Sequence, residues 1–213
     1  MSLKIRKINM LTVILSCSKH KHLWEEISER LGNILILCGG SDKITLVGNV
    51  LYLDCIDTYD GLSEKMMKAY SFIFSNQIFE SVTHVLKADD HDTFFTQLDI
   101  QNIESKYKDI LLHNDYIGQR IVHSEYLLGR CHHFGKVPKE SKWYNKCIEN
   151  KFVPYLGGGE VYILSKRALY YLVNNKEQYK DFCSYEDLMV GSVLNEYDIK
   201  PYEINLNIKT WFG

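Results

Sequence analysis

Short apolar runs separated by polar stretches mark the first part of the chain. Residues 11–16 form one such run and residues 34–37 form another, and both have the length and composition of buried β-strands. Between them, apolar residues recur at helical spacing from residue 23 until Gly32, a residue type that commonly ends helices. A strand, a helix and a second strand predict a βαβ unit and, with it, a mostly parallel sheet.

A further strand pattern ends in a cluster of charges. Residues 81–86 alternate and are rich in β-branched side chains, which predicts a strand. Asp89, Asp90, His91 and Asp92 follow it. Open α/β sheets bind ligands at the carboxyl ends of their strands, and a bridging cation relieves the repulsion between crowded carboxylates, so we interpret this cluster as a metal and nucleotide site. The alternative is a solvated acidic turn that closes a hairpin.

A strand and a helix are also predicted ahead of that cluster. Residues 50–53 form an apolar run, and the stretch that follows has one apolar face at helical spacing. Either Asp60 or Ser63 can cap the helix. Lys65 lies in its first turn, where the helix dipole offers a cation no advantage. It is therefore either an ordinary surface lysine or the partner of a phosphate or carboxylate group.

The second half of the chain contains three consecutive glycines, residues 157–159, ahead of the apolar residues 161–165. Their spacing matches neither a phosphate-binding nor a dinucleotide-binding fingerprint, so they form either a tight turn or a loop that lets the backbone approach a ligand. Ser165 is placed to cap the helix that follows. Further along, Ser184 and Asp187 have the spacing of a capping box.

Composition narrows the class of protein. The 213 residues are 46% hydrophobic and 24% charged, with no Pro-, Gly- or Ser-rich linker, which predicts one globular domain. A net charge of -2 gives no reason to expect a nucleic-acid or membrane-surface partner. The apolar run at residues 10–15 is too short to span a bilayer and lacks a cleavage site. Because the sequence shows no signal peptide or membrane anchor, we expect a cytoplasmic location, in which the six scattered cysteines, without a Cys-x-x-Cys pair, stay reduced.

Stretches in order, from about residue 50 to residue 191, resemble the β-1,3-galactosyltransferase and Fringe group of glycosyltransferases. The first two are Asp57–Lys65, similar to Asp-x-Tyr-x-Asn-Leu-Thr-x-Lys but with Gly61 where Asn is usual, and Leu86–His91, similar to the Lys-x-Asp-Asp-Asp form of the DxD motif. The other two are Tyr155–Ser165, similar to a glycine-rich strand that ends in Tyr-x-x-Ser, and Glu186–Gly191, which matches Glu-Asp-x-x-x-Gly.

The resemblance implies a single GT-A domain over residues 1–213, of the α/β class, with a central, mostly parallel sheet flanked by helices. Residues 1–95 would form the nucleotide-sugar half and residues 96–213 the acceptor half. The implied reaction is a metal-dependent, inverting transfer of a hexose or N-acetylhexosamine from a UDP-sugar to an acceptor hydroxyl. The acceptor would be a glycan or glycoconjugate, with a β-1,3-type linkage.

The resemblance also implies roles for individual residues. By motif position, Asp187 resembles the family's catalytic base, and Glu186 resembles the neighbour that orients the acceptor. The residues expected to bind the substrate are Asp57, Lys65, Asp89, Asp90, Gly158, Gly159 and Glu160.

The expected metal site departs from the family pattern in two ways. Asp89 and His91 are the expected ligands, with His91 where the family has its third aspartate, while Asp90 and Asp92 offer a second register. An imidazole ligand favours a first-row metal, so manganese is the expected cofactor. The family often adds a metal-binding histidine near its C-terminus, whereas no histidine follows His133 in this sequence.

Two other functions fit the same residues. Clustered carboxylates with a histidine also serve metal-dependent hydrolysis of phosphate esters. The departures at the metal site are equally those of a degenerate GT-A domain that binds a nucleotide or glycan without catalysis.

Overall fold

The structure is a computed structural model that describes residues 7–91, 93–123, 136–146, 152–182, 185–206 and 208. The strands of its main sheet are β1 Met10–Leu15, β2 Ile34–Cys38, β3 Thr45–Val47, β4 Val50–Tyr52, β5 His84–Asp89, β6 Tyr116–Gly118, β9 Tyr162–Ser165 and β10 Tyr202–Glu203. A separate pair consists of β7 Ile121–Val122 and β8 Tyr155–Leu156. The helices are α1 Trp24–Leu31, α2 Leu62–Ser75, α3 Gln97–Lys106, α4 Lys108–His113, α5 Lys166–Asn174 and α6 Glu186–Glu196, and short 3-10 turns include η1 Ser18–Leu23 and η2 Tyr59–Gly61.

The sheet is mixed, with a parallel centre. Across the described residues its strands lie in the order β10-β6-β9-β5-β1-β2-β4-β3. Four neighbouring strands, β5, β1, β2 and β4, run parallel, while β9 runs antiparallel to β5 and β6. Leu15 pairs with both Leu37 and Asp89, so the carboxyl ends of β1, β2 and β5 meet at one edge. The α/β class, the βαβ opening and the mostly parallel sheet predicted from the sequence are confirmed.

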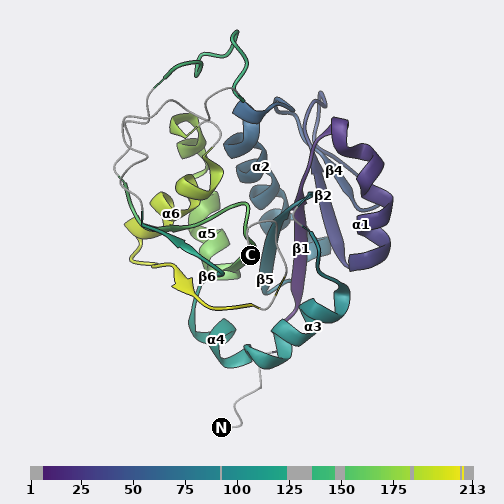
Figure 1. The fold of residues 1–213 in the computed structure, drawn as a ribbon, viewed down its shortest axis with the longest axis vertical. Coiled ribbons are helices and arrows are strands. Elements are labelled where there is room, and N and C mark those ends of the chain that lie inside the picture. The colour runs from purple at the N-terminus through teal and green to yellow at the C-terminus, as the bar shows by residue number, and fades with distance from the viewer. Residues whose placement is uncertain are drawn as a thin grey trace.

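Helices cover both faces of this sheet, and successive side chains of a strand point to opposite faces, so each strand contributes to two cores. On β1, Leu11 and Val13 belong to the core that includes residues of α2, α5 and α6, whereas Met10 and Ile14 belong to the core that includes residues of α1 and α3. Figure 1 shows α2, α5 and α6 grouped on one side of β1 and β5, with α1 and α3 on the other. None of the helices in the described part of the chain is long and apolar enough to cross a bilayer.

The start of α2 differs from the prediction. Neither Asp60 nor Ser63 caps it: the helix continues from η2, its N-cap is Gly61, and no side chain makes a capping hydrogen bond. Asp60 is held in η2, where its carboxylate accepts a hydrogen bond from the Thr58 hydroxyl. A Cβ added at Gly61 would overlap the Ile56 carbonyl oxygen, which explains a glycine where the family usually has asparagine.

In the second half of the chain, the predicted Ser165 cap is confirmed, whereas the predicted capping box at Ser184 falls outside the described residues. Ser165 caps α5 by accepting the backbone N–H groups of Arg167 and Ala168. The structure gives α6 Tyr185 as its N-cap, with no side-chain cap hydrogen bond from that residue. Ser184 lies outside the described residues. Asp187 lies in the first turn of α6. Its carboxylate faces the turn at residues 157–159, called here the glycine turn.

Candidate active site

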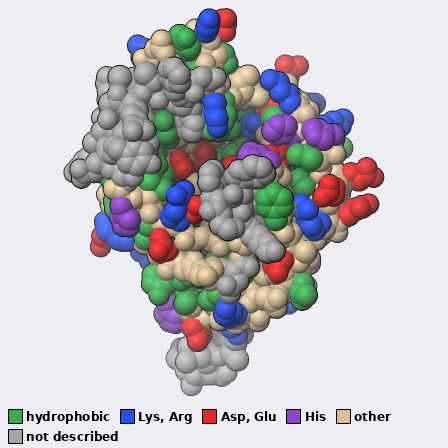
Figure 2. Space-filling view, viewed as in Figure 1, with side chains coloured by type: hydrophobic (Ala, Val, Ile, Leu, Met, Phe, Trp, Pro, Cys, Tyr) green, Lys and Arg blue, Asp and Glu red, His purple; other side chains and the backbone are tan. Residues whose placement is uncertain are grey.

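A pocket of about 440 Å³ opens where β1 and β5 end. Its walls include the turn after β1, the start of α2, the glycine turn and the start of α6. Figure 2 shows acidic side chains in the floor of a hollow on this face and histidines along one side. Of the predicted site residues, Asp92 lies outside the described ranges and Glu160 is not in the pocket wall. The pocket brings together the others: Asp57, Lys65, Asp89, Asp90, His91, Gly158, Gly159, Glu186 and Asp187.

Lys65 and Asp57 form a buried ion pair in this wall. The Nζ atom of Lys65 lies 2.7 Å from Asp57 Oδ1 and donates to the Ser16 carbonyl oxygen at 2.8 Å. Asp57 also accepts the backbone N–H groups of Gly39 and Ser18, each at 2.8 Å. Burial works to raise the pKa of Asp57, but the bonds from Lys65 and Ser18 outweigh it and hold that pKa below its usual range. Lys65 is thus the partner of a carboxylate, and the surface-lysine interpretation is wrong.

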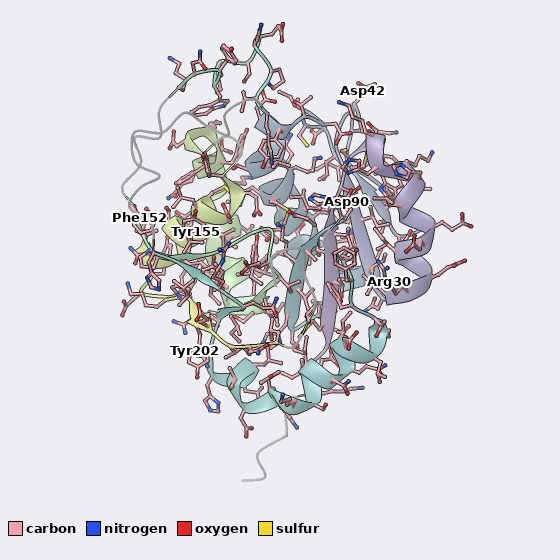
Figure 3. The ribbon with its side chains drawn as sticks, viewed as in Figure 1. Arg30, Asp42, Asp90, Phe152, Tyr155 and Tyr202 are labelled. Carbon is pink, nitrogen blue, oxygen red and sulfur yellow. The ribbon has the colours of Figure 1, made fainter. Side chains whose placement is uncertain are left out.

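Asp90 lies just beyond β5 and is the centre of a second network (Figure 3). Its carboxylate is bonded by the Ser16 hydroxyl at 2.6 Å, by His20 Nδ1 at 2.8 Å and by His91 Nδ1 at 2.9 Å. The Trp24 indole donates to the Ser16 oxygen at 2.8 Å. Burial works to raise the pKa of Asp90, but these bonds outweigh it and lower that pKa. An ionised carboxylate only accepts, so both imidazole Nδ1 atoms are donors here.

The same residues could hold a metal ion. One ligand atom from each of His20, Asp90 and His91 lies within 4.8 Å of the other two. Among the described residues, these three form the one group of His, Cys, Asp or Glu side chains close enough to share a metal ion. Two imidazoles and a carboxylate suit manganese and other first-row metals, so the residues fit the expected cofactor. Asp89, expected beside His91, faces Lys87 instead: β5 ends at Asp89, so residues 89 and 91 do not continue its alternation.

Lys87 joins three parts of the pocket wall. Its Nζ atom lies 2.7 Å from Asp89 Oδ1 and 2.7 Å from Glu186 Oε1, and it donates to the Gly158 carbonyl oxygen at 2.8 Å. Glu186 also accepts a hydrogen bond from the Tyr162 hydroxyl at 2.9 Å. The end of β5, the glycine turn and the start of α6 are therefore held by one ammonium group. The Glu186 side chain is directed at these internal partners, and the residue is 4% exposed.

The two carboxylates around Lys87 share one positive charge. Burial opposes that charge, but Asp89 and Glu186 outweigh burial and raise the pKa of Lys87. Burial raises the pKa of Glu186 to about 7, and the attraction of Lys87 opposes this only in part. Lys87 therefore keeps its charge, and Glu186 is the carboxylate that gains a proton near neutral pH.

Asp187 is held at the pocket by backbone N–H groups. Its Oδ2 accepts the N–H of Gly158 at 3.0 Å, and its Oδ1 accepts the N–H of Leu188 at 2.8 Å. Burial raises the pKa of Asp187 above its usual range, while the Gly158 N–H works in the opposite direction. A Cβ added at Gly158 would overlap Glu186 Oε1, so the absence of a side chain lets the turn approach both acids.

Two cations that the sequence did not single out also line the pocket. Arg120 forms an ion pair with the buried Glu160, with Nε and Oε1 2.9 Å apart, and its side chain is 57% exposed. Lys136 lies with its Nζ atom 5.0 Å from the centre of the Tyr59 ring. The glycine turn is thus followed by a carboxylate that binds an arginine of the pocket wall.

The profile of the galactosyltransferase family matches residues 41–205, which is most of the chain. This chain belongs to the galactosyltransferase family. The match spans the four motifs and confirms the resemblance drawn from them. Within the family's Glu-Asp-x-x-x-Gly motif, the glycine has a packing role here, because a Cβ added at Gly191 of α6 would overlap Tyr155 Cβ of β8.

Comparisons with other proteins add the following. No curated protein matches this member of the galactosyltransferase family. A 4-diphosphocytidyl-2C-methyl-D-erythritol synthase from Anaerococcus prevotii is similar over 98% of this chain and 93% of its own, with 13% identity and a TM-score of 0.45. A second crystal structure of a 4-diphosphocytidyl-2C-methyl-D-erythritol synthase is similar over 95% and 92%, with 10% identity and a TM-score of 0.47. Similarity of this extent says nothing about substrate or activity.

Sequence reasoning missed two central members of the site. Lys87 interrupts an apolar strand, and a charge in such a position needs a buried partner, so the signal was present. His20 lies in a polar stretch after β1 with no pattern that marks it. Only the pairing of β1 with β5 brings it to Asp90.

Proposed function

We propose that this protein is an inverting, metal-dependent glycosyltransferase that moves a hexose or N-acetylhexosamine from a UDP-sugar to a hydroxyl group of a glycan or glycoconjugate. A β-1,3-type linkage follows from the motif resemblance. The observation that carries the proposal is that Asp187, from the family's Glu-Asp motif, lines the same pocket as Asp89, Asp90 and His91 from its DxD-like motif. The candidate base and the candidate metal site thus face one cavity.

Asp187 is the proposed general base. Its two bonds to backbone N–H groups fix the carboxylate without placing another acidic or basic side chain on it. Burial raises its pKa, which makes the carboxylate a stronger acceptor for the proton of an attacking hydroxyl. The Glu186 carboxylate is paired with Lys87 and accepts a hydrogen bond from Tyr162, and we propose that it supports the base through Lys87 and Gly158.

The donor side is proposed around Asp57, Lys65, Asp89 and Asp90. A divalent ion bound there would neutralise the charge that develops on the diphosphate leaving group. Lys65 is already bonded to Asp57 and the Ser16 carbonyl, so its role is to hold the wall of the nucleotide pocket. Gly158 and Gly159 would lie along the sugar, where the glycine turn allows close approach. Glu160, outside the pocket wall, would act through its ion pair with Arg120.

The Asp187→Asn variant tests this function. We would incubate the protein and manganese with UDP-galactose, UDP-glucose, UDP-N-acetylglucosamine or UDP-N-acetylgalactosamine and a panel of methyl glycosides. Proton NMR of the product gives the anomeric configuration. We expect a β-linked product from these α-linked donors and a loss of about 10²–10⁴ in rate for Asp187→Asn. Calorimetry should show UDP affinity within about twofold of the original protein, because the substitution removes a base and keeps the cavity.

The matched control is Asp42→Asn, which removes an exposed carboxylate outside the pocket and should leave the rate unchanged. Transfer that survives Asp187→Asn would contradict the assignment of the base. UDP binding with no turnover of any of these donors would favour the degenerate binding domain. Hydrolysis of bis(p-nitrophenyl) phosphate without sugar transfer would favour the hydrolase. A two-metal hydrolase needs more converging ligands than the one three-residue cluster found in the described ranges.

A further inference from the structure

We propose that His20, Asp90 and His91 form the metal site of this protein, with a histidine from the turn after β1 as one of the ligands. The proposal deepens the proposed function, because it names the ligands of the ion that would serve the UDP-sugar. It also differs from the motif-based expectation, in which Asp89 and His91 are the ligands.

The distances around Asp90 suit a shared ion. His20 Nδ1 and His91 Nδ1 lie 2.8 Å and 2.9 Å from the two oxygens of Asp90. Neighbouring ligand atoms at right angles around an ion, each about 2.1 Å from it, are about 3 Å apart. His20 lies against Oδ2 of Asp90 and His91 against Oδ1, so an ion bound by both carboxylate oxygens could take the place of the two ring protons.

Hydrogen bonds from neighbouring residues orient the Asp90 carboxylate, as is usual for a metal ligand. Its side chain is 2% exposed and is held by the Ser16 hydroxyl, which in turn accepts the Trp24 indole N–H. The His20 and His91 side chains are 42% and 62% exposed, so an ion and a diphosphate can reach them from the pocket. Ligands that are oriented by a second layer of hydrogen bonds are typical of protein metal sites.

The Asp89 carboxylate is paired with Lys87 and not with the histidines. Its Oδ1 lies 2.7 Å from Lys87 Nζ, on the side of the site that holds Glu186 and the glycine turn. A metal bound to Oδ1 of Asp89 would compete with the buried ammonium of Lys87 for this oxygen, which is unfavourable. The adjacent residue Asp90 faces the histidines instead, so the two acids serve different partners.

The donor set predicts which metals bind. Two imidazoles and one carboxylate favour first-row transition metals, whereas magnesium prefers oxygen ligands in an octahedral arrangement. We therefore expect manganese and cobalt to bind more tightly than magnesium when each is titrated without nucleotide.

The experiment measures the binding of manganese to the protein in the absence of nucleotide. Calorimetry with manganese chloride would be run on the full chain, on His20→Ala and on His20→Gln, and electron spin-echo envelope modulation of bound Mn²⁺ would detect nitrogen ligands. The original protein should show coupling to two histidine nitrogens. Each His20 variant should lose one of them and at least tenfold in affinity, on the order of the 10–100-fold that even outer-layer partners contribute. Thermal unfolding checks that the variants are folded.

His22→Ala is the matched control, because His22 lies in the same η1 turn, with its ring centre 6.5 Å from that of His20, and is outside the cluster. It should bind manganese as the original protein does. Manganese binding without nitrogen coupling, unchanged binding in both His20 variants, or no binding to the original protein would each overturn the proposal. A loss of manganese binding in an Asp89→Asn variant, with binding unchanged in the His20 variants, would also overturn it. Two coupled nitrogens without UDP binding would leave this metal site intact and count against the proposed function. Manganese-dependent sugar transfer without nitrogen coupling would leave the proposed function intact and count against this metal site.

Discussion

Two buried lysines support the pocket, and they differ in the number of carboxylates around them. Lys65 pairs with one carboxylate, Asp57, whereas Lys87 lies between two, Asp89 and Glu186. Each lysine also donates one hydrogen bond to a backbone carbonyl oxygen. The surroundings of the two nitrogen atoms are therefore alike in geometry and different in charge.

This difference in charge decides where a proton is held. Asp57 has a pKa below its usual range, because the bonds from Lys65 and Ser18 outweigh burial. Glu186 has its pKa raised to about 7, because burial dominates and Lys87 is shared with Asp89. A balanced buried pair keeps both charges, whereas a cluster with a surplus carboxylate gains a proton near neutrality. The second kind of cluster lies next to the proposed base.

Removing the shared ammonium should have the largest effect. Lys87→Met leaves two carboxylates without their cation in a buried place, and we expect the free energy of unfolding to fall by roughly 3–5 kcal/mol. Lys65→Met should be milder, because Asp57 keeps two bonds from backbone N–H groups. Urea denaturation at pH 7 measures both.

A second substitution sharpens this test. Adding Glu186→Gln to Lys87→Met should restore part of the lost stability, because it removes one of the stranded charges. Equal losses for the Lys65 and Lys87 variants, or no recovery in the double variant, would contradict the difference in charge balance.

The Glu186→Gln variant on its own tests the raised pKa. A carboxyl group whose pKa is higher in the folded protein stabilises it fully below the unfolded value, near 4.5, and loses this contribution as the pH rises through about 7. The unfolding free energy of the original protein should therefore fall relative to Glu186→Gln by roughly 2–3 kcal/mol between pH 4.5 and pH 8. Denaturation series at several pH values measure it, and a difference that stays constant would show that Glu186 does not gain a proton.

The Asp57→Asn variant should show the opposite dependence of stability on pH and the smallest change in the free energy of unfolding. Because the pKa of Asp57 is lowered, its charge stabilises the fold above the usual aspartate range, and this contribution disappears as the pH falls through the folded value. We expect Asp57→Asn to lower the free energy of unfolding by about 1 kcal/mol at pH 7 and by less in acid. The same denaturation series would measure it. A penalty that grows toward acid would be the wrong sign for a balanced pair.

The sequence determined the local elements of this protein and the order of its motifs. Apolar runs located β1 and β2, and helical spacing located α1, because that period follows from the backbone itself. Alternation predicted a strand at residues 81–86, and the structure has β5 three residues further on, at His84–Asp89. The acidic residues fall where β5 ends, as its pattern indicated. Ser165 also capped its helix as expected, since a cap needs only neighbours one turn away.

The tertiary structure alone decided which charges meet. His20 reaches Asp90 from 70 residues away, and the partners of Lys87 come from the glycine turn and from α6. Such pairings are set by strand order, register and the packing of helices on the sheet, and the periodicity of a single segment carries none of these.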